Sequence, residues 1–138
     1  MANVKITDLT AASTPLAGTE LLEIVQSGVS VKAAAAGTYM VAPSLQFANS
    51  DTNDHEVNIW FRKNGTDIAN SNTVINVPKA ADGGNNFFQV VFYEQVTAAQ
   101  YIEVMWLPTN VSVTLDYIAA GAIAPAAPSV ILTSERIA

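Results

Sequence analysis

Apolar side chains recur at every second position along most of this sequence. Val57, Ile59 and Phe61, for example, alternate with more polar or amphipathic residues. A period of two places such side chains on one face of a β-strand, whereas a helix repeats every ~3.6 residues. No window of about ten residues keeps the helical period. The alternation therefore predicts an all-β protein.

Residues that favour turns divide the chain into about ten short strands. Each predicted strand is bounded by Gly, Pro, Asn or Asp, which interrupt regular structure for different steric reasons. The alanine-rich residues 33–39 fit either a short helix or a linker. The predicted strands cover residues 3–9, 21–26, 29–33, 44–49, 56–63, 73–78, 86–96, 101–107, 111–119 and 129–134.

Two turns are specified by their residues. Asn64 and Gly65 can both adopt a positive φ, as a type I′ turn requires, and they separate two strand-like segments. We therefore expect a β-hairpin at residues 60–68. Residues 26–29 carry a weaker form of the same signal and predict a small hairpin near the N-terminus.

The distribution of large apolar residues divides the chain in two. Residues 1–41 contain too few of them to hold a core, and an isolated hairpin is marginal in water. Residues 42–138 contain enough for one compact β-rich body, and Pro43 stands near the boundary. We expect the N-terminal segment to dock on another part of its own assembly or on a larger structure.

Charge excludes several kinds of partner. The net charge is −6 and the basic residues are not clustered, so nucleic acid is not an expected partner.

The longest apolar tract, residues 118–132, is interrupted by prolines and is too short for a membrane span. The N-terminus does not have the pattern of a secretory signal, and the sequence contains no Cys. We expect the chain to be made in the cytoplasm of the cell that expresses it.

The low charge also predicts association. Charged residues make up 13% of the chain, whereas about 25% is usual for soluble domains. Burial of side chains between subunits would explain the difference, because lasting interfaces are more apolar than ordinary surface.

The strand at residues 101–107 has large side chains on both faces. Ile102, Val104 and Trp106 alternate with Tyr101 and Met105. A strand that is apolar on both sides needs a second partner besides its own core, and another copy of the chain can supply it. We predict that Tyr101, Met105 and Trp106 contribute to a subunit interface.

The sequence offers little support for catalysis. His55 lies among carboxylates at residues 51–56, but Asp and Asn commonly stabilise turns there. A site for calcium or a similar cation is the weaker interpretation of that loop. Glu94, Glu103 and Asp116 would have to meet in space to cleave a glycoside, and no nucleophile motif is present. We predict no catalytic residue, no metal ligand and no cofactor.

Aromatic side chains allow two interpretations. Burial in the core or in a subunit contact is favoured, because aromatics contribute much of the area buried in both. Stacking on a carbohydrate is the alternative. Arg62 is expected to form an ion pair between strands or subunits. The aromatic residues in question are Trp60, Phe92, Tyr93, Tyr101 and Trp106.

Two parts of the sequence resemble phage proteins. Residues 6–9 and 16–32 look like an N-terminal module found at the start of many phage tail-fibre and other virion proteins. Residues 45–49, 58–68, 98–106 and 128–133 resemble the compact jelly-roll domains of phage structural proteins, which are similar to C1q and tumour-necrosis-factor-like trimers.

The resemblance implies a homotrimer of two-sheet antiparallel jelly-roll sandwiches. Residues 1–41 would anchor it to other proteins of the virion, and residues 42–138 would form the trimer. The residues expected to anchor it are Ile6, Leu9, Leu21, Leu22, Ile24 and Val25.

The chain is short and has no collagen-like or coiled-coil stem. These features favour a capsid decoration protein, a head fibre or a small tail appendage over a long fibre. The alternative is a fibre tip that recognises a host-surface glycan or protein through the loops at residues 49–56 and 80–86, since loops on a rigid scaffold often carry recognition.

Overall fold

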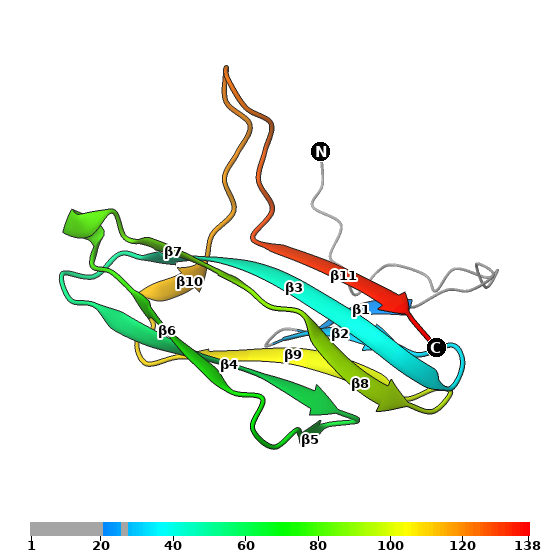
Figure 1. The fold of residues 1–138 in the computed structure, drawn as a ribbon. Helices are drawn as coiled ribbons and strands as arrows, with labels where there is room; N and C mark the ends of the chain where they lie inside the picture. Colours follow the sequence, from blue (N-terminus) through cyan, green and yellow to red (C-terminus); the bar gives the residue numbers. More distant parts are fainter. Residues whose placement is uncertain (1–20, 26–27) are drawn as a thin grey trace.

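The computed structural model describes residues 21–25 and 28–138, with side chains from Ser30 onward. In these residues, two antiparallel sheets pack face to face as a jelly-roll-like β-sandwich (Figure 1). The prediction of an all-β, two-sheet fold is confirmed. The only helical element of the described residues is the single 3-10 turn η2, Ala80–Asp82. No helix in the described part of the chain is long and apolar enough to cross a membrane.

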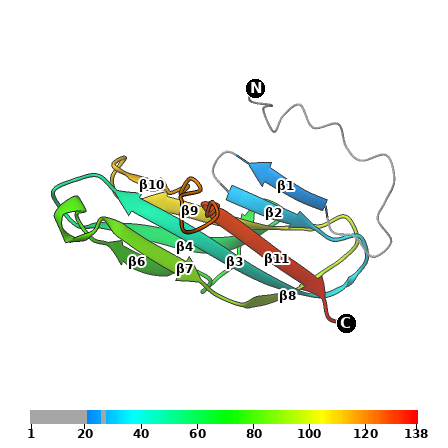
Figure 2. The ribbon, with the colours of Figure 1, turned by 90° about the horizontal axis from the view of Figure 1, so that it is seen from above.

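The first sheet, sheet A, is built around two long central strands. Its order is β1-β2-β9-β4-β5, and β6 pairs with β4 beside β5. Figure 2 shows that β1 and β2 lie to one side of β11, so sheet A extends past the second sheet there. The strands are β1 Leu21–Val25, β2 Gly28–Lys32, β4 His55–Lys63, β5 Thr66–Asp67, β6 Thr73–Val77 and β9 Tyr101–Pro108.

The second sheet, sheet B, is organised on one strand, β3, which runs from Gly37 to Asn49. β8 and β7 pair along one edge of β3, and β11 and β10 pair along the other. Every other strand of sheet B therefore depends on β3 for its hydrogen bonds. The partners of β3 are β7 Asn85–Gln89, β8 Phe92–Val96, β10 Val113–Leu115 and β11 Val130–Arg136.

The sequence suggested a boundary between two parts of the chain near Pro43. In the structure, Pro43 lies inside β3. It is fully buried and opposite Leu132 of β11. On the other edge of β3, β7 and β8 pair with it in the same register. Val90 and Val91 are the two residues that separate β7 from β8. Proline has no N–H to donate, so the ladder is interrupted at this point. The single strand predicted at residues 86–96 is therefore divided in two, whereas β3 is continuous through residues 41 and 42.

Both predicted hairpins are present. Asn64 and Gly65 have φ values of 50° and 76°, and the strand residues on either side, Lys63 and Thr66, are paired. β1 and β2 pair from Leu21↔Lys32 to Val25↔Gly28 around residues that lie outside the described part of the chain.

The N-terminal hairpin is part of the sandwich of its own chain. β2 pairs with β9 over five residues, from Gly28↔Met105 to Lys32↔Tyr101. Residues 33–36 form a bend and not a helix, so the linker interpretation is correct for them, whereas residues 37–39 already belong to β3.

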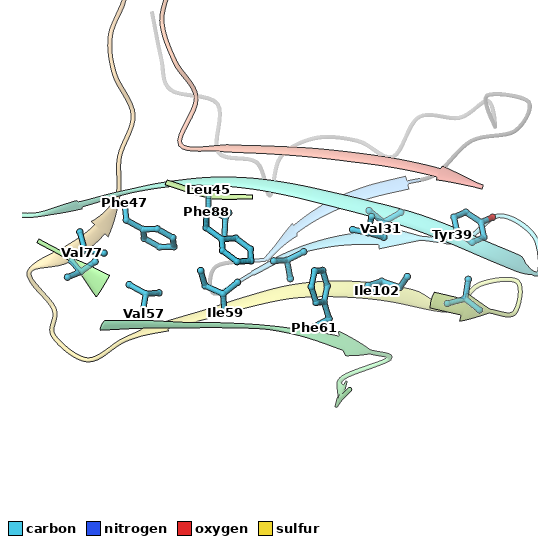
Figure 3. Close-up of a cluster of buried hydrophobic side chains, with 14 of the residues drawn as sticks. Val31, Tyr39, Leu45, Phe47, Val57, Ile59, Phe61, Val77, Phe88 and Ile102 are labelled. Atoms are coloured by element: carbon cyan, nitrogen blue, oxygen red, sulfur yellow. The ribbon is translucent and has the colours of Figure 1, made fainter. Parts of the chain in front are cut away.

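The core lies between the two sheets and follows the alternation of the sequence. In β3, the odd-numbered residues from Tyr39 to Asn49 are buried and the even-numbered ones are not. Phe61 of β4 and Phe92 of β8 stack across the two sheets, with ring centroids 4.1 Å apart and an interplanar angle of 8°. Figure 3 shows the buried side chains meeting between the layers, among them Val31, Tyr39, Leu45, Phe47, Val57, Ile59, Phe61, Val77, Phe88 and Ile102.

Candidate interaction surfaces

The outer face of sheet A has charged side chains together with exposed apolar ones, among them Val74 and Leu107. The register pairs Arg62 with Glu103 and Trp60 with Met105, all on the side away from the core. Neighbouring residues in a strand alternate between faces, so the buried Ile59 and Phe61 fix this assignment. From Ser30 onward, where side chains are described, the charged residues at outward positions of this sheet are Lys32, Glu56, Arg62, Asp67 and Glu103.

Asp67 connects two side chains of β4. Its Oδ1 accepts hydrogen bonds from Nε1 of Trp60 and from Nε of Arg62, both at 2.7 Å. The hydrogen bond from Arg62 is the main reason that the pKa of Asp67 is below its ordinary value, and the bond from Trp60 adds to it. The same carboxylate raises the pKa of Arg62. The ion pair expected for Arg62 is thus formed between strands of one chain, and it holds the indole of Trp60 by its N–H.

A shallow groove of about 470 Å³ lies beside this cluster. Trp60 and Leu107 form much of its apolar part, and three asparagines surround it. Nδ2 of Asn72 donates to Oδ1 of Asn58 at 3.0 Å, which orients two of the amides. We call this site the Trp60 groove; its lining is Asn58, Trp60, Asp67, Ile68, Asn70, Asn72 and Leu107.

The three residues predicted for a subunit interface do not share one face. Ile102 and Val104 are buried in the core, and Trp106 packs against the same core. Tyr101 and Met105 alternate with them and point to the outer face of sheet A, where both are half-buried. The two-sided nature of β9 is confirmed, and Trp106 belongs to its inner side. Whether Tyr101 and Met105 contact a second chain stays a prediction.

The outer face of sheet B has a different composition. The outward side chains of β3 are small or uncharged, and large apolar ones flank them. Phe87, Tyr93 and Ile131 pair with outward positions of β3 and are each at least half exposed. In the strands of sheet B as described, Glu135 is the one charged residue at an outward position. We call this surface the neutral face; its residues are Thr38, Met40, Ala42, Ser44, Gln46, Ala48, Asn85, Phe87, Gln89, Val91, Tyr93, Gln95, Thr114, Ile131, Thr133 and Glu135.

A hairpin-like arm, residues 116–129, projects from the sandwich between β10 and β11 (Figure 1). Ile118 and Ala127 bond each other at its base, N to O in both directions at 3.0 and 2.8 Å, and Gly121 donates to Ala124 near its tip. All residues from 119 to 126 are exposed, and Ile123 is fully so. The sequence has no charged residue between Asp116 and Glu135. The alternation at residues 111–119 predicted a longer strand, but β10 ends at Leu115.

The two loops expected to recognise a ligand meet at one end of the molecule. The backbone N–H of Ala80 donates to the carbonyl of Asp51 at 2.9 Å, and the N–H of Lys79 donates to Oδ1 of Asp54 at 2.9 Å. Asn49 is buried and donates through Nδ2 to the carbonyls of Asn53 and Val77. The polar side chains of this end therefore bond mainly to neighbouring backbone, as turn-forming residues do.

His55 is engaged in the same way. Its Nε2 lies 2.7 Å from Oδ2 of Asp51, and this contact is the main reason that the pKa of Asp51 is lowered. In the described residues, no group of three or more His, Cys, Asp or Glu side chains could hold a metal ion.

The carboxylates considered for glycoside cleavage lie in different places. Glu94 of β8 pairs with Lys63 of β4 at an edge between the sheets. Glu103 is on the outer face of sheet A, where it accepts a hydrogen bond from the N–H of Gly65 at 2.8 Å. Asp116 follows β10 at the base of the arm, so the structure does not bring the three together.

The anchoring residues are only partly within the described structure. Leu21, Leu22, Ile24 and Val25 belong to β1, of which the backbone is described. Ile6 and Leu9 lie outside the described residues.

The neutral face and the arm were not predicted from the sequence. The sequence did contain a signal for the arm, namely the absence of charged residues between Asp116 and Glu135. An extended segment of this length without charge has few solvating groups on either of its faces. The interpretation of residues 118–132 went only as far as excluding a membrane span. No protein-family model matches the chain, and no curated protein is similar enough in sequence to count as a relative.

Proposed function

We propose that this chain is a structural protein of a bacteriophage particle that acts by assembling, as a homotrimer, and not by catalysis. The neutral face is the observation that carries the assembly part of the proposal. The phage assignment depends on the resemblance of residues 6–9 and 16–32 to a virion anchoring module and of the body to phage jelly-roll domains.

The difference between the two outer faces supports assembly. Sheet A has charged residues along its outer side, and the neutral face has Glu135 alone at the outward strand positions described. Phe87, Tyr93 and Ile131 expose apolar area on the neutral face. Monomeric proteins rarely expose connected apolar patches of more than a few hundred Å². Contacts of standard size bury about 1,600 Å² in total, a gross gain of roughly 40 kcal/mol before association costs.

The position of the arm and the N-terminal hairpin suggests how the protein is used. The N-terminal segment would attach the trimer to other virion proteins, and the sandwich would project from the particle or clamp its neighbours. A capsid decoration protein, a head fibre or a small tail appendage would each work in this way. The protein would be made in the host cytoplasm and located in the virion.

A matched pair of substitutions tests the assembly surface. Ile131 and Val74 are both 50% exposed, but Ile131 is on the neutral face and Val74 is on the outer face of sheet A. We expect native mass spectrometry of the unmodified protein to show three chains, Ile131→Glu to give monomers, and Val74→Glu to remain trimeric. A monomeric unmodified protein at micromolar concentration would rule out the homotrimer.

The virion assignment has its own test. We expect the chain to be present in purified phage particles and to be located on them by antibody labelling in electron micrographs. Absence of the chain from purified, unmodified particles would contradict the assignment.

The Trp60 groove favours recognition of a host-surface glycan as the second candidate function. A sugar ring has an apolar C–H face that an indole can contact, and hydroxyls that planar amides can bond. Trp60 is fixed by Asp67, and Asn58, Asn70 and Asn72 supply the amides. On a glycan array, binding that is lost in Trp60→Ala but kept in Val111→Ala, at an exposed residue outside the groove, would support this function. Equal binding by both variants would reject the groove as the site.

A further inference from the structure

Asn64 is the one asparagine of the sequence that is followed by glycine. In a flexible chain such a pair is prone to deamidation, because glycine has no side chain to shield its nitrogen from the neighbouring amide. The nitrogen of Gly65 attacks Cγ of Asn64, the bond from Cγ to Nδ2 breaks, and ammonia leaves with the proton that Gly65 has lost. Water then opens the resulting succinimide ring to aspartate or isoaspartate. The pair is exposed in the hairpin between β4 and β5, so water can reach it.

The fold holds both reacting groups of this pair. The N–H of Gly65 donates to Oε2 of Glu103 at 2.8 Å. Oδ1 of Asn64 accepts from the N–H of Tyr101 at 2.9 Å, and the N–H of Asn64 donates to the carbonyl of Tyr101 at 3.0 Å. The side chain of Asn64 thus continues the ladder between β4 and β9 by one residue.

The contact with Glu103 opposes the reaction at the attacking nitrogen. A peptide nitrogen becomes a nucleophile only when it loses its proton, and a carboxylate is far too weak a base to remove that proton. The negative charge of Glu103 also disfavours a second negative charge on the nitrogen that it contacts. Glu103 therefore suppresses the nucleophile and does not activate it.

The contact with Tyr101 opposes the reaction at the amide under attack. Cγ of Asn64 has to move toward the nitrogen of Gly65, and Oδ1 cannot follow without leaving the N–H of Tyr101. That N–H would then lose its acceptor. The positive φ values of the pair, 50° and 76°, keep the turn in the form in which both contacts are made.

We propose that Asn64 is a deamidation site that the fold protects, and that Glu103 is the protecting residue. The site becomes reactive when the hairpin loses its contacts with Glu103 and Tyr101. Both products add a negative charge to a turn that Glu103 already contacts, and isoaspartate also lengthens the main chain there. The inference concerns a single chain, so it does not depend on the homotrimer or on glycan recognition.

Peptide mapping by mass spectrometry tests the proposal, because the reaction shifts the mass and isoaspartate separates from aspartate on chromatography. At neutral pH, we expect Asn64 to react at least about tenfold more slowly in the folded chain than in the same chain unfolded in guanidinium chloride. Glu103→Ala should recover much of that difference while it remains folded. Glu56→Ala is the matched control, since Glu56 is on the same outer face at the other end of β4, and it should leave the rate unchanged.

A second variant separates the charge of Glu103 from its contact. Glu103→Gln can still accept a hydrogen bond but has no charge, so its rate should lie between those of the unmodified chain and Glu103→Ala. The other asparagines of the same chain are the internal reference, because general unfolding would accelerate their deamidation as well. Circular dichroism checks that each variant is folded.

Three outcomes would overturn the proposal. Equal rates in the folded and the unfolded chain would show that Asn64 is not protected. Equal rates in the unmodified chain and Glu103→Ala, or acceleration of all asparagines together, would show that Glu103 is not the protecting residue. If Glu103→Ala does not fold, Glu103→Gln decides, and a rate no faster than that of the unmodified chain rejects the proposal.

Discussion

Gly84 shows how closely the chain approaches itself at one end of the sandwich. Its φ is 65°, and a Cβ placed there would lie 2.7 Å from the carbonyl oxygen of Asn49. The N–H of Asn49 also donates to the carbonyl of Gly84 at 2.6 Å, so the two backbones cannot separate without losing a bond. Glycine is the residue that this position requires, for both its conformation and its size.

Replacement of Gly84 by alanine should therefore destabilise the fold. We expect Gly84→Ala to lower the free energy of unfolding by about 2 kcal/mol or more, because the left-handed conformation and the close contact both penalise a Cβ. Gly121→Ala is the control, since Gly121 has open space around it and no left-handed φ. Urea denaturation of the two variants measures the difference, and equal midpoints would contradict this account of Gly84.

The ion pair between Asp67 and Arg62 gives a prediction about acid. The pKa of Asp67 in the folded chain lies below its ordinary value of 3.8. The pair therefore contributes to stability above that pH, and the contribution is lost as the pH falls through the lower folded value. Since Asp67 is exposed, the effect on stability is small and weakens with salt.

Trp60 fluorescence can follow this titration, because the indole N–H donates to the same carboxylate. In a Trp106→Phe background, we expect the emission of Trp60 to change with a midpoint below pH 3.8, and Asp67→Asn to abolish the change. Circular dichroism at each pH separates this local titration from unfolding. A midpoint above the ordinary value would show that Asp67 is not stabilised by Arg62.

At the scale of single residues, the sequence predicted the conformation of turns correctly, but it did not predict which other side chains a residue contacts. The Asn64-Gly65 pair specifies its own turn, since both positions need a positive φ, and both have it. For Trp106, alternation gave the correct face of the strand. It could not show which of two apolar faces met the core, because that depends on strands far away in sequence.

At the scale of elements, the two sheets are joined by aromatic packing. Phe61 of β4 and Phe92 of β8 are stacked across the sandwich. We expect Phe61→Ala to cost about 3–5 kcal/mol in unfolding free energy, as is usual for a buried phenylalanine. A double-mutant cycle of Phe61→Ala and Phe92→Ala should give a coupling of about 1 kcal/mol.

A second cycle serves as the control for this coupling. Phe47 is also buried, but Figure 3 places it away from Phe61, with Phe88 between them. Residues that do not touch are nearly additive, so the coupling of Phe61→Ala with Phe47→Ala should stay within about 0.5 kcal/mol. Equal coupling in both cycles would mean that the stack has no specific effect.

The end of the strand at residues 111–119 was predicted incorrectly, and the reason is physical. The alternation of Val111, Val113, Leu115 and Tyr117 continues past the point where the sheet stops. A period of two shows that a segment is extended and has two different sides. It does not show whether the partner of its apolar side belongs to the same chain. In the arm that follows β10, the side chains of residues 119–126 are exposed and do not pack on the sandwich.

At the scale of the molecule, the separation of charge onto one sheet predicts how salt acts on the assembly. Each copy has a net charge of −6, and the neutral face offers few charges that could form ion pairs across a contact. We expect added salt to stabilise the proposed trimer, because it screens repulsion between copies and leaves apolar contacts intact. Sedimentation at low and high ionic strength measures this, and dissociation by salt would indicate an interface held by ion pairs.

The central position of β3 in sheet B sets the order in which the protein can mature. Leu45 near its middle pairs with Val130, and Tyr39 near its start pairs with Arg136, so sheet B is incomplete until β11 has been synthesised. A chain whose synthesis has not yet reached β11 therefore has no finished neutral face. We expect contacts between nascent copies through that face to begin only after β11 has left the ribosome.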